Sequence, residues 1–284
     1  MEWLRCIRKT VEMIENDLKT DVSAEKIATE VGISTFFLQK GFSVMTGYSI
    51  REYARNRKLY QAALDLQTSD EKIIDIALNY GYETPESFTK AFTRFHGCTP
   101  SQVRAGASIK SFLPLKINIQ IFGGDQMNVK IVKMESFQVM GYQKVFSNEE
   151  NAEEKIPQFW DEVFQIQTVK ENPGLGIGEF GICIDEAGED TFRYFVAGRY
   201  TGGEVPAEME LLELPGGDYA VFDCYGPIPE TIQKMNTQVF QQWLPGNPNY
   251  ELRGNASVEW YDCNDEDMAS DSYHSAVWLP VKKI

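Results

Sequence analysis

Residues 73–92, which read IIDIALNYGYETPESFTKAF, decide the fold of the N-terminal part of the chain. Apolar residues recur at helical spacing from Ile73 to Ala77, and the glycine in Tyr80-Gly81-Tyr82 marks a tight turn. Pro85 then suits the first turn of a second helix, because its fixed φ is already helical. A short helix, a tight turn and a second helix predict a helix-turn-helix unit, whose second helix fits the DNA major groove.

The same pattern occurs once earlier in the chain. A helix around Ile27 ends at Gly32, and Ser34 can cap a following helix from Phe36 to Val44. One long helix, from about Ile50 to Gln67, joins the two units. We therefore expect an all-α N-terminal domain of seven helices, with two DNA-reading helices about one DNA turn apart, roughly 34 Å.

Further motifs follow or precede this stretch: FHG at residues 95–97, TPSQVR at 99–104, VGIS at 31–34 and FLQK at 37–40. With them the N-terminal part, residues 1–108, resembles the AraC/XylS family of transcription regulators. The resemblance implies that solvent-facing side chains of both reading helices contact DNA bases. These side chains are Thr35, Phe36, Gln39 and Lys40 in the first unit and Pro85, Glu86, Ser87 and Lys90 in the second.

The chemistry of these side chains differs between the two units. Lys40 and Lys90 can reach guanine acceptors or a phosphate, and Gln39 can pair with adenine. Pro85 has no polar side chain and Glu86 repels phosphate, so the second helix is expected to read less sequence than the first. On the connecting helix, the basic side chains expected to point outward are Arg51, Arg55, Arg57 and Lys58.

Charge is divided unequally along the 284 residues, a length that favours two domains. Residues 1–110 carry 15 Lys+Arg against 14 Asp+Glu, whereas the remaining residues carry 12 against 28. DNA affinity depends largely on neutralising phosphates, so the nearly neutral first part is the one suited to double-stranded DNA. The acidic second part should repel DNA and attract cations.

Composition excludes several other classes of protein. With 43% apolar and 24% charged residues the chain is typical of globular proteins, and no apolar run is long enough to span a membrane. Residues 1–19 contain charges throughout, unlike a secretory signal, so a cytoplasmic protein is expected. The five cysteines are scattered and only two histidines are present, so we expect no disulfide framework, metal site or cofactor.

The second part of the chain contains an internal repeat. After a connector at residues 109–126, strand-like alternation, a helical segment and two more strands follow one another between residues 127 and 200. The same order returns about 80 residues later, between residues 208 and 281. Duplication of a strand-helix-strand-strand unit predicts an α+β domain over residues 127–284, with pseudo-twofold symmetry and a crevice where its halves meet.

Four motifs specify this domain further: LPGGDYAVF at residues 214–222, WLP at 243–245, VEWYD at 258–262 and LPV at 279–281. With them the second part resembles the gyrase-inhibitor-like (GyrI-like) effector-binding domains. The domain order, with the DNA-binding part first, resembles the Rob branch of the AraC/XylS family. The resemblance implies a small-molecule effector.

Glu259 is the candidate that carries the chemistry of this domain. On a strand, Ser257, Glu259 and Tyr261 share one face. A carboxylate buried without a partner is costly, and a cationic, aromatic ligand would remove that cost and also interact favourably with aromatic faces. The resemblance likewise implies that Glu259 is the ligand-facing acid. The aromatic side chains chosen for the pocket walls are Trp160, Tyr194, Tyr225 and Tyr261.

The leading hypothesis is a non-catalytic transcription regulator, an activator of drug-efflux or stress genes that binds DNA, RNA polymerase and a lipophilic cation. An alternative is a GyrI-like hydrolase or ligand-sequestering protein built on Glu259 and Trp160. A third is a DNA-binding protein whose second domain is an interaction scaffold with a closed crevice. Since DNA and effector sites are expected on separate domains, Lys40→Ala should weaken DNA binding and leave binding of cationic dyes intact.

Overall fold

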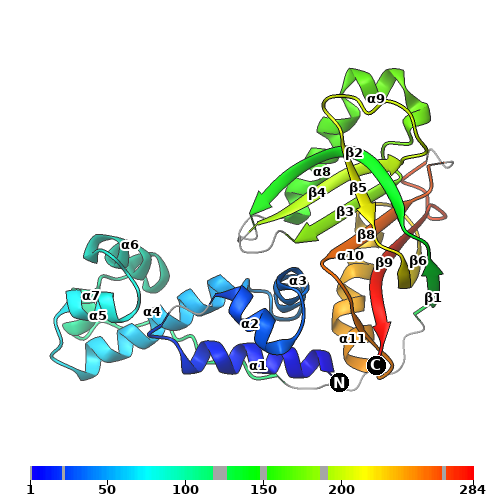
Figure 1. Cartoon of the computed structure of the whole chain (residues 1–284). Coiled ribbons are helices and arrows are strands. Elements are labelled where there is room, and N and C mark those ends of the chain that lie inside the picture. The colour runs from blue at the N-terminus through cyan, green and yellow to red at the C-terminus, as the bar shows by residue number, and fades with distance from the viewer. Residues whose placement is uncertain (1, 21–22, 118–126, 148–151, 186–190, 264–266) are drawn as a thin grey trace.

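The structure, a computed structural model, describes residues 2–20, 23–117, 127–147, 152–185, 191–263 and 267–284. The N-terminal part forms a helical arm and the C-terminal part forms a sheet domain (Figure 1). Within the described ranges no helix is long and apolar enough to cross a membrane. Part of the predicted connector, residues 118–126, lies outside the described residues.

Seven helices form the described part of the arm, as expected. Hydroxyl side chains begin several of them: Ser34 accepts a hydrogen bond from Phe37 N, and Thr84 accepts one from Ser87 N. Gly32 ends the second helix and Gly97 the sixth, each with a positive φ that glycine adopts without strain. The helices are α1 (Glu2–Asn16), α2 (Ala24–Val31), α3 (Thr35–Thr46), α4 (Ile50–Thr68), α5 (Ile73–Asn79), α6 (Pro85–His96) and α7 (Pro100–Arg104).

The two helix-turn-helix units have separate cores. The second unit, α5–α7, packs around Phe88, Phe92 and the C-terminal half of α4, and lies at the far end of the arm (Figure 1). The first unit, α1–α3, shares a continuous core with the sheet domain, which includes Trp3, Phe37 and Phe240. The first unit is therefore held against the sheet domain, while the second projects away from it.

The sheet domain consists of one antiparallel sheet with helices packed on it. Its strands are β1 (Val129–Met134), β2 (Phe137–Ser147), β3 (Phe180–Asp185), β4 (Thr191–Arg199), β5 (Glu210–Leu214), β6 (Gly217–Tyr225), β7 (Tyr250–Leu252), β8 (Ala256–Tyr261) and β9 (His274–Lys283). The helical segments are α8 (Ala152–Phe164), α9 (Gln167–Glu171), η1 (Pro173–Leu175), α10 (Glu230–Gln238), a π-helical turn η2 (Val239–Trp243) and α11 (Leu244–Gly246).

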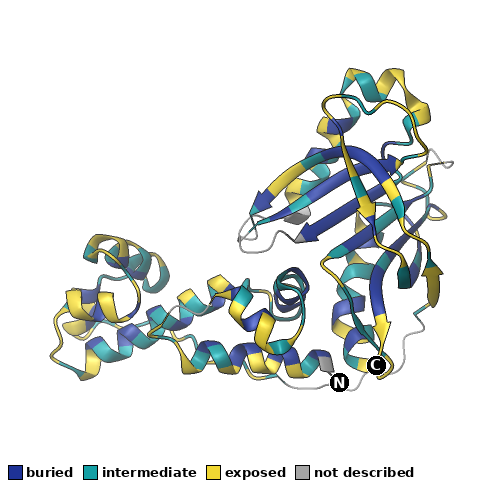
Figure 2. Ribbon diagram, in the orientation of Figure 1, coloured by how far each residue is buried: buried dark blue, intermediate teal, exposed yellow. Residues whose placement is uncertain are grey.

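Strand order confirms the predicted duplication. The strand order is β1-β6-β9-β8-β3-β4-β2-β5. Strands β1, β2, β3 and β4 of the first repeat correspond to β5, β6, β8 and β9 of the second, and corresponding strands lie at equal distances from the two ends of the sheet. The first strand of each repeat pairs with the other repeat, since β1 pairs with β6 and β5 with β2. The repeats therefore meet at the β3–β8 pair in the middle of the sheet, where most strand residues are buried (Figure 2).

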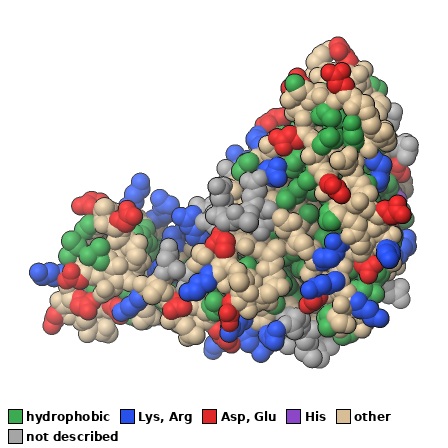
Figure 3. Space-filling model, viewed as in Figure 1, with side chains coloured by type: hydrophobic (Ala, Val, Ile, Leu, Met, Phe, Trp, Pro, Cys, Tyr) green, Lys and Arg blue, Asp and Glu red, His purple; other side chains and the backbone are tan. Residues whose placement is uncertain are grey.

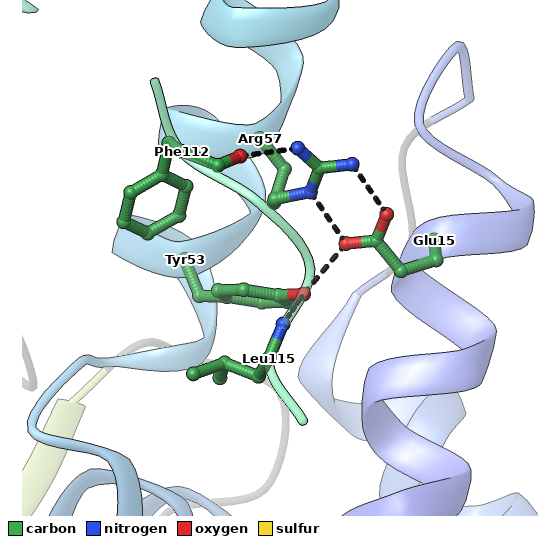
Figure 4. A network of polar contacts seen from close by, with 5 residues as sticks. All are labelled: Glu15, Tyr53, Arg57, Phe112 and Leu115. Carbon is green, nitrogen blue, oxygen red and sulfur yellow. Dashed lines mark hydrogen bonds and ion pairs between the residues drawn. The ribbon is translucent and has the colours of Figure 1, made fainter. Parts of the chain in front are cut away.

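The connector is fastened to the arm by hydrogen bonds to Arg57 and Tyr53, which themselves surround Glu15 of α1 (Figure 4). Arg57 Nε and Nη2 each lie 2.8 Å from a carboxylate oxygen of Glu15, and Tyr53 donates to the same carboxylate at 2.6 Å. Arg57 also donates to the carbonyl of Phe112, and the amide of Leu115 donates to the Tyr53 hydroxyl at 3.2 Å. The expectation that Arg57 points outward is therefore wrong, because its side chain is 5% exposed.

We predict that Glu15→Ala destabilises the arm strongly. The change leaves the Arg57 guanidinium buried without its carboxylate, which typically costs about 3 kcal/mol. Glu30→Ala is the control, because the Lys9–Glu30 pair is about half exposed and such pairs contribute less than about 1 kcal/mol. Urea denaturation followed by circular dichroism measures both losses, and equal losses would contradict the role given to Arg57.

Candidate functional site

The carboxylate of Glu259 lies at the centre of the sheet domain, on β8. Tyr194 and Tyr261 donate hydrogen bonds to its Oε2 at 2.9 and 3.1 Å, and Asn236 Nδ2 donates to its Oε1 at 2.9 Å. Among the described residues, these three hydrogen-bond partners of the carboxylate are uncharged. The carboxylate is therefore held in place by hydrogen bonds from uncharged groups.

The neighbouring strand is shaped to admit this arrangement. Gly181 on β3 is paired with Glu259, and a Cβ at position 181 would lie 2.1 Å from the Tyr194 hydroxyl and 3.1 Å from Glu259 Oε2. A glycine is therefore needed opposite the carboxylate. The Tyr194 hydroxyl in turn accepts a hydrogen bond from Trp160 Nε1 at 3.0 Å, which links α8 to the carboxylate.

Both tyrosines that face the carboxylate remain protonated at neutral pH. Burial raises the pKa of Tyr194 and of Tyr261 well above the ordinary value, and the negative charge of Glu259 raises each pKa further. A neutral phenol can donate a hydrogen bond to the carboxylate, whereas a phenolate would repel it. The site therefore keeps both of these hydrogen-bond donors over the physiological pH range.

A cavity of about 580 Å³ opens in front of the carboxylate. Its walls are mainly apolar, and the Trp160 and Tyr261 rings pack edge to face at 4.9 Å between centroids. Other apolar wall residues include Phe36, Ile156, Phe164, Phe192, Ile232 and Met268, and the charged ones are Lys40, Arg51, Asp161 and Glu259. An aromatic cavity with a fixed carboxylate is suited to a flat, lipophilic cation.

Four of the five predicted effector residues lie at this site. Glu259, Trp160 and Tyr261 line the cavity, and Tyr194 lies behind the carboxylate with 1% of its surface exposed. The prediction for Tyr225 is wrong, because this residue is 61% exposed and stacks on His274, outside the cavity. Sequence reasoning missed Asn236, because one polar residue on an amphipathic helix gives no signal of its partner.

In the second helix-turn-helix unit the predicted reading residues remain accessible. Glu86, Ser87 and Lys90 are exposed on α6, and Pro85 is half-buried at its start. Figure 3 shows Lys and Arg side chains along the edge of the arm between this unit and the sheet domain. A second hollow of about 530 Å³ lies near them, and its basic residues are Arg55, Lys90, Arg94 and Lys110.

In the first unit none of the predicted reading residues is fully exposed, since Phe36 is buried and Thr35, Gln39 and Lys40 are half-buried. Phe36 is 5% exposed, and Gln39 and Lys40 line the cavity in front of Glu259. Lys40 Nζ donates to Ser257 Oγ at 3.2 Å, across the boundary between arm and sheet domain. The structure therefore brings these predicted reading residues to the same cavity as Glu259, so the two sets of residues are not separated in this unit. The effect of Lys40→Ala on dye binding stays a prediction.

Both parts of the chain match known protein families. Residues 130–281 match the family of integron-associated effector binding proteins (Cass2), and residues 27–106 match a helix-turn-helix domain family (HTH_18). The chain is 36% identical over 98 residues to the HTH-type transcriptional activator AarP of Providencia stuartii, covering 34% of this chain and 73% of that protein. It is 24% identical to the transcriptional regulator Rob of Salmonella typhimurium, over 95% of both chains.

Among solved structures, SAV2435 bound to tetraphenylphosphonium matches with 22% identity and a TM-score of 0.48, covering 55% of this chain and 94% of that one.

The raised pKa values predict that the sheet domain loses stability in alkali. An acid whose pKa is raised by folding stabilises the folded state fully below its unfolded pKa, here about 10, and this contribution is lost as the pH rises further. The loss is about 1.4 kcal/mol per pH unit for each tyrosine. Urea midpoints between pH 9 and 11 should therefore fall less steeply in Tyr194→Phe than in the unaltered chain.

Tyr225→Phe is the matched control for this measurement, because Tyr225 is an exposed tyrosine of the same domain. Its urea midpoints should fall with pH as steeply as those of the unaltered chain. A Tyr194→Phe slope equal to that of the control would contradict the burial argument.

Proposed function

Because the chain belongs to the AraC/XylS family of DNA-binding transcription regulators and its C-terminal part to the integron-associated effector binding proteins, we propose that a lipophilic cation controls its activity. DNA binding and effector binding follow from the two families. The cationic nature of the effector, activation through contact with RNA polymerase, and action in the cytoplasm are our proposals. Activation is supported by AarP, a relative named as a transcriptional activator.

The observation that carries the proposal is the Glu259 carboxylate, which faces an aromatic cavity and has three uncharged hydrogen-bond donors. Taking a carboxylate out of water is costly unless a positive charge compensates it. A cation that enters the cavity supplies this charge and also contacts the faces of Trp160 and Tyr261. A neutral ligand of the same shape gains only the apolar contacts, so the site favours cations.

The alternative of a hydrolase built on Glu259 and Trp160 is not favoured. Rob, which matches most of this chain, and AarP, which matches its helix-turn-helix part, are named as transcription regulators. Burial also raises the pKa of the Cys183 thiol, which lines the cavity, to about 12. A thiol with so high a pKa stays protonated and is a poor nucleophile. We therefore propose that the site binds its ligand without chemical change.

The effector proposal predicts that the chain binds rhodamine 6G, a flat lipophilic cation, and that Glu259→Gln weakens this binding at least tenfold. The glutamine keeps the shape of the side chain and removes its charge. Dye fluorescence anisotropy measures the affinity. Rhodamine B carries a closely related xanthene cation with a free carboxylate, so its net charge is zero, and it should bind weakly to both proteins. Equal affinity of Glu259→Gln and the unaltered chain for rhodamine 6G would refute a charge-based site.

The DNA proposal predicts that Lys90→Ala weakens binding to duplexes selected by the full chain from a random-sequence pool. Lys90 is exposed on α6, and loss of one base contact should cost about 1–3 kcal/mol of binding free energy. Loss of a phosphate contact should reduce the slope of log affinity against log salt concentration by about one. Lys282→Ala is the control, since Lys282 is an exposed lysine at the end of β9. Anisotropy titrations at several salt concentrations measure both variants, and equal losses would contradict the assignment of α6.

A further inference from the structure

Helix α3, the reading helix of the first unit, covers the effector cavity. Lys40 Nζ reaches Ser257 on β8, and lies 5.5 and 5.8 Å from the centroids of the Phe36 and Phe240 rings. Both distances are in the range of cation–π contacts. The ammonium of the helix is therefore placed in the same kind of aromatic surroundings that the proposed effector requires.

The contact between α3 and the sheet domain is closely fitted. Gly41 faces the π-helical turn η2, and a Cβ at this position would lie 3.0 Å from Phe240 and 2.0 Å from Trp3. Glycine inside a helix costs about 1 kcal/mol relative to alanine, so its presence marks the close approach of Trp3 from α1, beside which Phe240 of the sheet domain also packs. Gln241 of the same turn donates to the carbonyl of Val44 at 2.9 Å. π-helical turns occur frequently at functional sites.

Lys40 and Glu259 act on the same part of the cavity. Ser257, the partner of Lys40, lies two residues before Glu259 on the same face of β8. Both charges also act on the thiol of Cys183, on the neighbouring strand β3: Lys40 lowers its pKa and Glu259 raises it. A cationic effector beside Glu259 would therefore be close to the Lys40 ammonium, and two like charges repel each other strongly where water is excluded.

The docked position of α3 also conflicts with DNA binding. A reading helix must place its exposed face in the major groove, which is about 12 Å wide. In the structure this face is directed at the sheet domain, with Phe36 buried and Lys40 hydrogen-bonded to Ser257. Docking of α3 thus leaves α6 accessible and withholds the first unit from DNA.

We propose that Lys40 is a tethered competitor of the cationic effector, and that effector binding releases α3 from the sheet domain and makes it available to DNA. This inference rests on the proposed function of the Glu259 site. A ligand shifts such an equilibrium only through its different affinities for the two states. Effector and DNA both favour the released state, so each increases the affinity for the other by the same factor.

Replacement of Lys40 by methionine tests the competition directly. Lys40→Met keeps an apolar stem of similar length and removes the charge, so rhodamine 6G should bind about fivefold more tightly or better, within the usual range of such couplings. The affinity for rhodamine B should not rise, because this dye has no net positive charge for Lys40 to compete with. Lys90→Met, at an exposed lysine of the other reading helix, is the matched control and should bind rhodamine 6G like the unaltered chain.

The outcomes of this test separate the inference from the proposed function. Unchanged or weaker rhodamine 6G binding by Lys40→Met would overturn the competition while leaving the Glu259 site intact. Tighter binding of both dyes would show that methionine only adds apolar surface, and this result would also overturn the inference. Failure of every protein to bind rhodamine 6G would refute the proposed function together with the inference.

Two further measurements test the release of α3. Acetylation by N-hydroxysuccinimidyl acetate, followed by mass spectrometry, should modify Lys40 faster in the presence of rhodamine 6G and leave the rate at Lys90 unchanged. Saturating rhodamine 6G should also strengthen binding to the selected duplex at least fivefold, and not in Glu259→Gln. Slower acetylation of Lys40, or weaker DNA binding with the dye, would show that the dye holds α3 in place and would overturn the inference.

Discussion

The structure is organised around one carboxylate, that of Glu259, which faces the cavity between the arm and the sheet domain. Its hydrogen bonds to Tyr194, Tyr261 and Asn236 fix its position but supply no positive charge. Glu259 is half-buried, and a partly desolvated carboxylate is stabilised by an opposite charge close to it, so the site favours a cation. The glycine at position 181 and the hydrogen bond from Trp160 to Tyr194 are consequences of packing these donors around a single carboxylate.

The duplicated topology explains why the charge lies where it does. Because the first strand of each repeat pairs with the other repeat, the β3–β8 pair occupies the middle of the sheet. Each repeat packs a helix on its own strands, α8 on β2 and β4, and α10 on β6 and β9. A residue on β8 can therefore meet side chains from α8 of the first repeat and α10 of the second. The cavity is formed jointly by both repeats, as Trp160 and Asn236 on either side of Glu259 show.

Much of the fold, and the place of Glu259 in it, could be predicted from the sequence, because these features depend on local patterns. Helix caps, glycine turns and strand alternation predicted the arm helices and the duplicated sheet, and alternation along β8 placed Glu259 and Tyr261 on one face. The misses all depend on contacts between distant segments. Arg57 looks like a surface cation until Glu15 is known to lie beside it, and Tyr225 lies at the exposed end of its strand. Lys40 was placed on the solvent face because nothing local shows that a second domain covers α3.

The chemistry of lysine explains how one side chain can serve two partners. A reading helix needs a cation for DNA, and any such cation is attracted to the acidic sheet domain of the same chain. Lysine carries its charge as a compact ammonium on a flexible apolar stem, so it can pass between Phe36 and Phe240 and still reach Ser257. An arginine would bring a broad planar group with five donors, which this mainly apolar passage does not satisfy. The same ammonium is therefore suited both to bind a phosphate when α3 is free and to be displaced by a stronger-binding cation when α3 is docked.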